Sequence, residues 1–351
     1  MKISTYNTDK DSKVFIIAEL SANHGSDIKI AIETIKAAKR AGADAIKLQT
    51  YTADTITLDS KKKHFKINQG THWDGQYLYN LYKQASLPWD WHAELFEVAK
   101  NQGLICFSSP FDVTAVDLLE DLNNPIYKIA SFEITDIPLI SYVASKGKPM
   151  IISTGIATIE DIELAIKTCK AAGNEDITIL KCTSAYPANP EDANLKTIKD
   201  IAKRFNVKSG LSDHTLGIEA PMIAVAMGAT VIEKHFILNK NIGGPDAHFS
   251  LDETEFKQMV EAVRLTETLL GTVDYEMTEK KKESREFSRS LFVTENVKKG
   301  TLITSKNIRS IRPGFGLHPK HYKDVLGMSF SKDVEKGTPL SFNLIKTDSD
   351  E

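Results

Sequence analysis

Ionisable and hydroxyl side chains stand where the apolar runs of this sequence stop. The run VIEKHF begins as a buried strand would and then carries Glu233, Lys234 and His235. Other strand-like runs end in similar side chains, which are Glu19, Lys47, Gln49, Ser108, Ser109, Lys128, Ser131, Ser153, Lys181, Thr183, Ser212 and His214. Buried polar groups without partners cost about 1–3 kcal/mol each, so packing alone does not explain this convergence. We therefore expect one shared active site at the ends of these strands.

Two of these residues, His214 and His235, end consecutive predicted strands about one helix apart. Adjacent strands lie about 4.8 Å apart, so the two imidazoles can share one cation. With two protein ligands, such an ion keeps positions open for water and substrate. Asp213 and Glu233, beside the histidines, are placed to orient the rings as hydrogen-bond acceptors. The alternative interpretation is a pair of hydrogen-bonded core histidines.

A second group combines one ammonium, that of Lys128, with several hydroxyls, namely Ser109, Ser131, Ser153, Ser184 and Ser212. A positive charge with hydroxyl donors around it suits a phosphate or a carboxylate. For each serine alone, the alternative is a helix cap or a hydrogen bond to nearby backbone. Taken together, these residues predict an anion site.

The elements that position these residues follow a regular order. From Val14 to about Gly271 the predicted strands are VFIIAE, DAIKLQ, LICFSS, IYKIAS, PMIIST, ITILKC, VKSGLS and TVIEKHF. Between them lie segments of helical period, several of which end in Gly, the common signal of a helix C-terminus. About eight strand–helix units in ~250 residues predict an α/β fold, the (β/α)8 TIM barrel, with its active site at the carboxyl ends of the strands. A doubly wound open sheet is the alternative, although no G-x-G-x-x-G follows the first strand.

One connection is longer than a barrel loop needs to be. Roughly 40 residues separate KLQT from the helix expected near Asp90, where about 2–6 residues are usual. This segment contains Trp73, Trp89, Trp91, Tyr77, Tyr79 and Tyr82. We expect it to form a lid or a binding wall. The alternative is a satellite hydrophobic cluster packed on the barrel.

The composition changes after Gly271. We predict a barrel domain over residues 1–275, a charged linker over 276–289 and a small, mainly β domain over 290–351. In the last segment VKKGT at Val297 returns as VEKGT at Val334, and each copy predicts a strand followed by a Lys-Gly turn. A domain of ~60 residues has a small core, so we expect it to dock on another surface.

The bulk composition argues against several classes of protein. The chain has 351 residues, a formal net charge of -3 and a pI near 6.3, which disfavour nucleic acid or an anionic membrane as the main partner. No apolar stretch approaches the roughly 20 residues that cross a bilayer, and the first residues lack the apolar core of a signal peptide. The three cysteines form no C-x-x-C pair. We expect a cytoplasmic protein.

A series of motifs in order resembles the sialic acid synthase family: AELSANH, DAIKLQT, FSSPFD, YKIASFE, STG, CTSAYP, GLSDHT, EKHF and GGPD. The tail RSLFVTENVKKGTLITSKNIRSIRPGFG is similar to that family's antifreeze-like (SAF) domain. The resemblance implies a (β/α)8 barrel that condenses phosphoenolpyruvate with an N-acetylated amino sugar. It also implies a divalent metal (Mn²⁺, Mg²⁺ or Co²⁺) and a domain-swapped homodimer.

Within the family, SSPFD and GGPDAHFSL resemble the branch whose sugar is 2,4-diacetamido-2,4,6-trideoxy-L-altrose rather than N-acetylmannosamine. That sugar has a methyl group in place of the C6 hydroxyl, so its enzyme needs an apolar patch. We expect Trp73, Tyr77 or Phe65 to supply it.

The resemblance also implies roles for single residues. His214 and His235 match metal ligands, while Lys47, Ser109, Lys128, Ser131, Ser153 and Ser212 match groups around phosphoenolpyruvate. The residues that match the sugar side are Glu19, Glu133, Tyr186 and Asp246. Arg312 matches an arginine that the partner subunit places over the N-acetyl group, and Phe287 matches an aromatic near the sugar. Ser184 stands where the family usually has asparagine, so its phosphate contact is lost or is remade through water.

The implied reaction joins C3 of phosphoenolpyruvate to the sugar aldehyde, adds water at C2 and loses phosphate by C–O cleavage. Lys128 and Lys47 hold phosphoenolpyruvate, and Glu133 or Glu19 accepts the proton of that water. Sister synthases that make sialic or legionaminic acid are the first alternative. A Schiff-base aldolase with Lys128 or Lys181 is the second. A non-enzymatic carbohydrate- or ice-binding module is the third.

Overall fold

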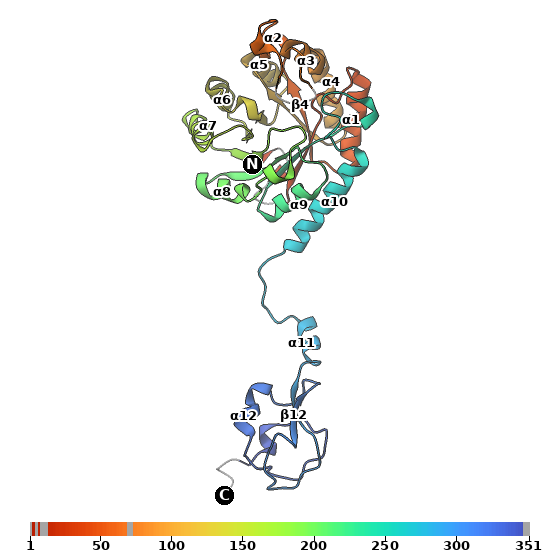
Figure 1. Cartoon of the computed structure of the whole chain (residues 1–351), viewed down its shortest axis with the longest axis vertical. Coiled ribbons are helices and arrows are strands. Elements are labelled where there is room, and N and C mark those ends of the chain that lie inside the picture. Colours follow the sequence, from red (N-terminus) through yellow and green to blue (C-terminus); the bar gives the residue numbers. More distant parts are fainter. Residues whose placement is uncertain (1, 4–5, 8–12, 69–72, 347–351) are drawn as a thin grey trace. The chain divides into compact units, whose positions relative to one another are not determined.

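The computed structural model describes residues 2–3, 6–7, 13–68 and 73–346, and the chain divides into two compact units, Met1–Gly271 and Thr272–Glu351 (Figure 1). The first unit contains a closed barrel of parallel strands in the order β10-β3-β4-β5-β6-β7-β8-β9, which confirms the predicted fold. Its strands are β3 (Phe15–Glu19), β4 (Ala45–Thr50), β5 (Ile105–Pro110), β6 (Tyr127–Ile129), β7 (Met150–Ser153), β8 (Ile177–Cys182), β9 (Lys208–Asp213) and β10 (Val231–His235). A short antiparallel pair, β1 (Lys2–Ile3) and β2 (Tyr6–Asn7), precedes them.

Helices surround these strands (Figure 1). They are α1 (Ile28–Arg40), α4 (His92–Asn101), α5 (Val113–Asp121), α6 (Ile137–Ala144), α7 (Ile159–Ala171), α8 (Thr197–Phe205), α9 (Glu219–Ala226) and α10 (Glu253–Leu270). Several begin at side chains that accept a hydrogen bond from the free amides of the first turn. Asp252 does so for α10, and Glu255 returns the bond in a capping box.

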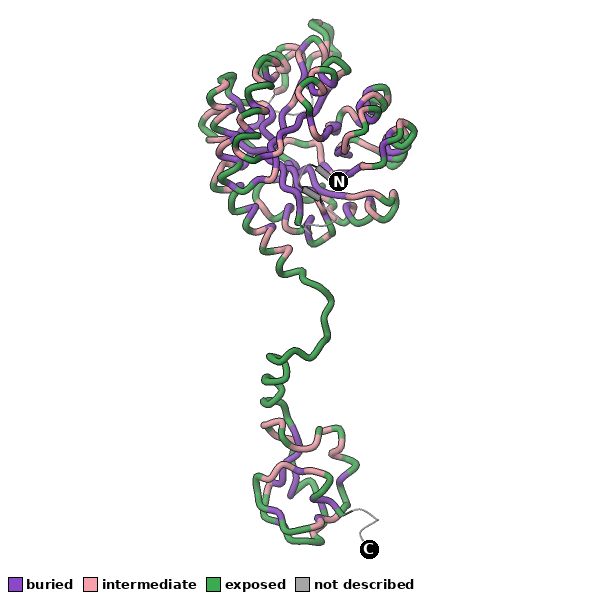
Figure 2. Tube along the Cα trace, turned by 180° about the vertical axis from the view of Figure 1, so that it is seen from behind, coloured by how far each residue is buried: buried purple, intermediate pink, exposed green. Residues whose placement is uncertain are grey.

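The alternation of side chains along each strand sets the floor of the barrel. Residues two apart point to the same side, so Val231, Glu233 and His235 share the inner face of β10. The lower inner layer is an apolar cluster of Phe15, Ile17, Ala45, Phe107, Ile126, Ile151, Leu180 and Val231. The outward side chains pack against the helices, and the buried residues are concentrated along the strands (Figure 2). The polar side chains at the strand ends therefore lie next to a layer of apolar side chains that fills the interior of the barrel.

The long connection between β4 and α4 has secondary structure of its own. It contains α2 (Ala53–Ile56), α3 (Leu78–Ala85) and two short 3₁₀ helices, Lys63–Phe65 and Trp89–Trp91. Lys66 and Tyr77 form an isolated antiparallel bridge that closes its central part. Because it carries its own hydrogen bonds, this segment can stand as a wall rather than as a bare loop.

The second unit is built around one antiparallel pair, β11 (Ser290–Val293) and β12 (Ile308–Ile311), with α12 (Tyr322–Val325) and two 3₁₀ turns, Pro319–His321 and Phe342–Leu344. Its buried core includes Leu291, Ile308, Phe330, Leu340 and Leu344. The repeated motifs pair with each other, because Val297 and Val334 exchange two backbone hydrogen bonds of 2.9 Å. Each copy turns at a glycine with positive φ, Gly300 and Gly337.

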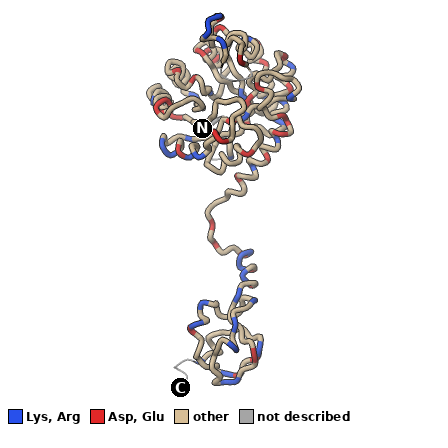
Figure 3. Tube along the Cα trace, in the orientation of Figure 1, with Lys and Arg blue, Asp and Glu red and all other residues tan. Residues whose placement is uncertain are grey.

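The charged segment at the start of this unit, predicted as a linker, contains the helix α11 (Glu279–Arg285). Thr278 caps its first turn, and its basic residues are coloured blue in Figure 3. All of its residues are exposed. Within the described ranges, no helix combines the length and the apolar character needed to cross a membrane.

Candidate active site

A cavity of about 900 Å³ opens at the carboxyl ends of the barrel strands. Most of the predicted site residues line it: Glu19, Lys47, Gln49, Lys128, Ser131, Glu133, Ser153, Ser184, Tyr186, Ser212, His214, His235 and Asp246. They come from the strands β3, β4, β6, β7, β9 and β10 and from the segments that follow β6, β8, β9 and β10. Closure of the barrel thus brings together side chains that are more than 200 positions apart, as the strand-end pattern predicts.

The segment between β4 and α4 forms one wall of this cavity. Its lining residues are Ile56, His64, Lys66, Ile67, Trp73, Leu78, Leu81, Tyr82 and Ala85. Trp91 instead packs against the barrel core, with its ring 5.9 Å from that of His24. Of the three rings expected to contact a methyl group, Trp73 lines the cavity. Tyr77 and Phe65 are absent from the lining that the described residues form, which corrects the prediction for those two.

A row of alternating charges forms the floor. Lys47 Nζ is 2.7 Å from Glu19 Oε2 and 3.8 Å from Glu233 Oε2. Lys128 Nζ is 3.4 Å from Glu233 Oε1, which also accepts a 2.9 Å hydrogen bond from Ser212. All of these side chains are buried, so their charges act at low dielectric and are screened little by salt.

This environment separates the pKa values of the carboxylates. Burial raises the pKa of Glu133 to about 7, with Lys128 as the main opposing charge. Burial also raises the pKa of Glu19, although Lys47 opposes the shift. For Glu233, the effect of burial is outweighed by Lys128 and Lys47, and its pKa is lowered. Glu133 is therefore suited to exchange a proton near neutral pH, whereas Glu233 stays ionised.

Small side chains form a cradle beside Lys128. The Gly155 amide donates to Ser131 Oγ over 3.2 Å, and Ser131 Oγ donates in turn to Cys182 Sγ over 3.3 Å. A Cβ atom on Gly155 would lie only 1.9 Å from Ser184 Oγ. Ser153 Oγ is buried without a hydrogen-bond partner among the described residues. A hydroxyl so placed is available to an anion, since a permanently unpaired one would be costly.

The two predicted metal ligands lie side by side, with ring centroids 5.1 Å apart. Strand register explains this, because Lys234 pairs with Asp213 and the next residue of each strand is a histidine. His214 Nδ1 is 3.1 Å from the Thr183 carbonyl, which leaves the other ring nitrogen to face a ligand. His235 Nδ1 is buried with no hydrogen-bond partner in the described part of the chain, and it lies 3.6 Å from Asp246 Oδ2. The described residues contain no group of three or more His, Cys, Asp or Glu arranged for a metal, so the candidate ligands are these two imidazoles. Two adjacent imidazole rings of this kind fit a divalent cation.

The expectation that Asp213 and Glu233 orient the histidine rings is wrong. Asp213 accepts from Lys234 Nζ over 2.5 Å and from the Thr215 amide over 2.9 Å. Lys234 is fully buried and points away from the inner face of β10, as the alternation requires. Glu233 is committed to the lysines of the floor. The His214 ring is oriented instead by the backbone carbonyl of Thr183.

Polar groups opposite the cradle hold Glu19 in place. Gln49 Nε2 donates to Glu19 Oε1 over 2.8 Å and to Ser21 Oγ over 2.9 Å.

The Tyr186 ring lies 4.6 Å from that of His214 and 6.1 Å from that of Trp73. The wall and the histidines are thus connected through one aromatic side chain.

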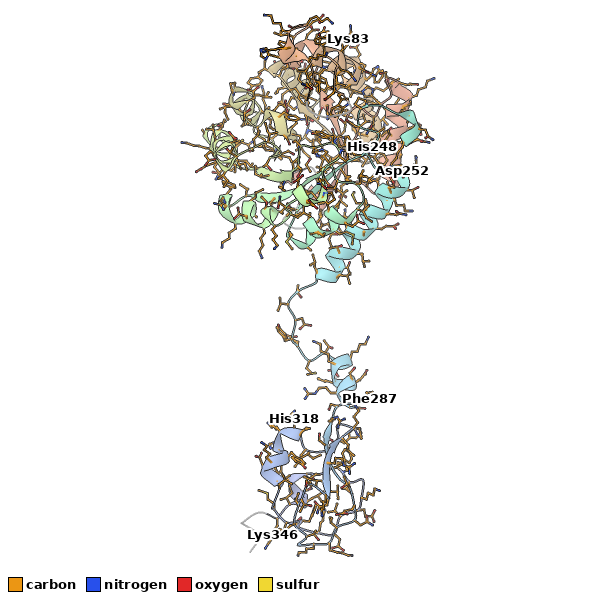
Figure 4. All side chains as sticks on the ribbon, in the orientation of Figure 1. Lys83, His248, Asp252, Phe287, His318 and Lys346 are labelled. Carbon is orange, nitrogen blue, oxygen red and sulfur yellow. The ribbon has the colours of Figure 1, made fainter. Side chains whose placement is uncertain are left out.

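Four residues of interest lie outside the cavity lining. Ser109 is fully buried behind Lys47, with its Oγ 3.3 Å from Nζ. Lys181 donates to the Cys182 carbonyl over 2.7 Å. Arg312 and Phe287 belong to the second unit and are exposed on it, and Figure 4 labels Phe287.

Sequence reasoning missed the part that three residues play in or behind the cavity. Glu233 is the common partner of both lysines, which its inward position two residues before His235 could have indicated. Ser21 lines the cavity at a positive φ of 47°, for which AELSANH holds no clear signal. Phe249, in GGPDAHFSL, packs on both histidines, and only its place in that motif pointed to it.

Comparison with known proteins gives consistent results for both units. The NeuB family matches residues 34–275, and the SAF domain matches residues 288–346. The chain is 50% identical over 340 residues to a pseudaminic acid synthase of Campylobacter jejuni, covering 97% of this chain and 98% of the relative. It is 51% identical over 327 residues to the pseudaminic acid synthase of Helicobacter pylori, covering 93% and 96%. An N,N'-diacetyllegionaminic acid synthase of Legionella pneumophila is 37% identical over 338 residues, covering 95% and 94%.

Solved structures agree with this relationship. The N-acetylneuraminic acid synthetase of Leptospira borgpetersenii, in complex with citrate, superposes with a TM-score of 0.70 at 32% identity, over 78% of this chain and 91% of that one. The spore coat polysaccharide biosynthesis protein SpsE of Bacillus subtilis superposes with a TM-score of 0.67 at 34% identity, over 99% of each chain.

Proposed function

This chain belongs to the NeuB family, and we propose that it is a pseudaminic acid synthase. It condenses phosphoenolpyruvate with 2,4-diacetamido-2,4,6-trideoxy-β-L-altropyranose to give pseudaminic acid and phosphate. The observation that carries the proposal is 50% identity to pseudaminic acid synthases over almost the full length, against 37% for a legionaminic acid synthase. The resemblance to the sialic acid synthase family is confirmed by the family match.

The anionic substrate fits the basic side of the floor. Lys128 and the cradle of Ser131, Ser153 and Gly155 are suited to the phosphate group, with Lys47 beside the carboxylate. Each lysine already faces a carboxylate, so the substrate meets ammonium groups that Glu19 and Glu233 hold in fixed positions. Such fixed groups bring C3 of phosphoenolpyruvate close to the sugar aldehyde at little further entropic cost.

The adjacent imidazoles of His214 and His235 are the observation in favour of a divalent ion, which would lie between the proposed anion site and the proposed sugar site. His214 and His235 would hold it, and Mn²⁺, Mg²⁺ or Co²⁺ are the candidates. When bound, the ion would supply Lewis acidity toward the aldehyde oxygen. Asp246 and Tyr186, which line the same part of the cavity, are proposed to orient the sugar.

Glu133 is the proposed base for the water that adds to C2. Its pKa of about 7 allows it to accept a proton from water and later release it near neutral pH. Glu19 is a weaker candidate because it is already paired with Lys47 at 2.7 Å. The former aldehyde oxygen takes up a proton, and the tetrahedral intermediate then loses phosphate by cleavage of the C–O bond at C2, so the C2 carbonyl oxygen of the open-chain product comes from water.

We expect a homodimer in which the second unit of the partner subunit places its copy of Arg312 over the sugar.

The rival chemistry is a Schiff base on a lysine. On Lys181 it is disfavoured because Nζ donates hydrogen bonds to the Cys182 carbonyl and to Thr183 Oγ1. Lys128 lines the cavity, so a Schiff base there must be tested by experiment.

Phosphate release with a panel of sugars tests the proposal. The altrose-derived diacetamido sugar should be the preferred acceptor, and N-acetylmannosamine and the legionaminic precursor should be at least about 10-fold poorer in kcat/KM. Preference for either of the other sugars would overturn the assignment within the family. Trapping of substrate by borohydride with loss of activity would instead indicate a Schiff base.

A further inference from the structure

The segment after β10 folds back on the strand and closes one side of the two histidines. The Leu251 amide donates to the His235 carbonyl and the Ile237 amide donates to the Leu251 carbonyl, both over 2.9 Å. Asn23 Nδ2 fastens the turn by donating to the Phe236 carbonyl over 3.0 Å and to Ser250 Oγ over 2.8 Å. Figure 4 labels His248 and Asp252 in this part of the chain. The segment is therefore held to the end of β10 by hydrogen bonds at the two residues that follow residue 249.

Phe249 is the buried aromatic residue of this segment, with 1% of its surface exposed, whereas the neighbouring His248 is exposed. Its ring centroid lies 4.9 Å from that of His235 at an interplanar angle of 66°. It lies 6.0 Å from that of His214 at 76°. The Tyr186 ring is 5.4 Å away on another side. One phenyl ring thus packs edge-on against both candidate metal ligands.

The two histidines differ in how their rings are held. A histidine that binds a metal is usually oriented by a hydrogen bond on its other side. His214 has such a bond to the Thr183 carbonyl. The buried Nδ1 of His235 has no hydrogen-bond partner among the described residues, and the nearest carboxylate oxygen, on Asp246, is 3.6 Å away. What restrains the His235 ring is therefore chiefly its packing against His214 and Phe249.

We infer that Phe249 is a positioning residue for the metal site: its ring fixes the orientation of both imidazoles, and of His235 in particular. The inference rests on the proposed function for the metal itself. A leucine at this position keeps the site apolar but has no flat ring, so the His235 imidazole gains rotational freedom that it must lose on binding an ion. Phe249 is not among the described residues that line the cavity, so its removal should weaken metal binding and leave turnover at saturating metal nearly unchanged.

The experiment compares F249L with F256L in the full chain. Phe256 is an equally buried phenylalanine on α10 whose ring packs on Phe236, 5.1 Å away, rather than on the histidines. Binding of Mn²⁺ alone is measured without substrates, by electron paramagnetic resonance of free Mn²⁺ or by calorimetry, beside the thermal stability of each variant. F249L should raise the Kd for Mn²⁺ about 10-fold, the lower end of effects from groups that orient metal ligands, and F256L should leave it within about 2-fold.

Equal Kd changes in the two variants would overturn the inference, since a general loss of packing would then explain them. An unchanged Kd in F249L would do the same. If F249L does not fold, F249M offers similar volume without a ring and should show the same rise. Wild-type protein that binds no Mn²⁺ would overturn the metal part of the proposed function as well, so the two failures are distinguishable.

Discussion

Glu233 lies between Lys128 and Lys47, with carboxylate-to-ammonium distances of 3.4 and 3.8 Å. Both lysines are almost fully buried, so this carboxylate is what keeps two ammonium groups stable side by side in the interior. Glu233 thereby holds the two ammonium groups in place, where an incoming anion can bind them.

Removing that carboxylate charge should therefore destabilise the empty enzyme. In E233Q the two ammonium groups lose their shared partner, and breaking a buried ion pair costs about 3–5 kcal/mol. Urea unfolding at pH 7.5 should show a loss of this order. A loss below about 1 kcal/mol would contradict the view that Glu233 holds the lysines.

The proton on Glu133 should be visible in the activity. The pKa of about 7 predicts that kcat rises with pH through neutrality, because the base must be ionised to accept a proton. E133Q should lower kcat by about 10² or more and abolish that limb of the profile. If E133Q keeps the same rise of kcat through neutral pH, the ionisation that causes this rise belongs to a residue other than Glu133.

The same pKa shift should be visible in stability. Burial raises the pKa of Glu133 from 4.5 to about 7, so the folded state holds its proton more tightly than the unfolded chain does. The free energy that this bound proton adds to the stability of the folded state is thus fully present below pH 4.5 and is lost as the pH rises through about 7. The unfolding free energy of the wild type relative to E133Q should fall over this window, by on the order of 3 kcal/mol. A relative stability that rises with pH would show that the sign is wrong.

Gly155 should tolerate no side chain. In G155A the new Cβ would meet Ser184 Oγ at 1.9 Å and Ser131 Oγ at 2.7 Å, which displaces the cradle. The KM for phosphoenolpyruvate should rise about 10-fold, with a smaller change for the sugar. The double variant G155A/S184A relieves the closer contact and should recover part of the loss, with S184A as its control. No recovery would mean that the clash is absorbed elsewhere.

Chelation should remove activity reversibly if the two histidines hold an ion. Treatment with a chelator should inactivate the wild type, and Mn²⁺ should restore it. Mn²⁺ should also raise the Tm of the wild type, because an ion that binds only the folded state stabilises it, and it should not raise that of H214A/H235A. Full activity in a metal-free preparation would exclude the proposed role.

Mixing two inactive variants tests whether the subunits exchange their second units. R312A and K128A, coexpressed, should give about a quarter of wild-type activity, because half of the dimers are mixed and each has one intact composite site. If each second unit serves its own barrel, no activity returns. K128A with E133Q is the matched control, since both changes lie in the barrel and cannot complement.

Much of this architecture follows from local sequence patterns. Most strands between Phe15 and His235 combine apolar residues with polar residues at or just after the strand end, and these signals are local. The inward position of Glu233 can be read from its place two residues before His235, but its contacts with Lys47 and Lys128 depend on barrel closure and on the course that each long side chain takes. The outward turn of Lys234 toward Asp213 explains why the expected orientation of the histidines by carboxylates was wrong. The bridge between Lys66 and Tyr77 is a non-local pairing that no short motif indicates.

The reciprocal bonds between Val297 and Val334 bear on how the second unit folds. Two similar segments that bind each other in the same way on both sides have the relationship of subunits about a dyad. The bridge therefore relates the two VxKGT segments by a local two-fold, and each supplies the backbone partners that the other lacks. A fragment that ends before Val334 would leave the backbone groups of Val297 without these partners, so the two copies have to fold as one cooperative unit.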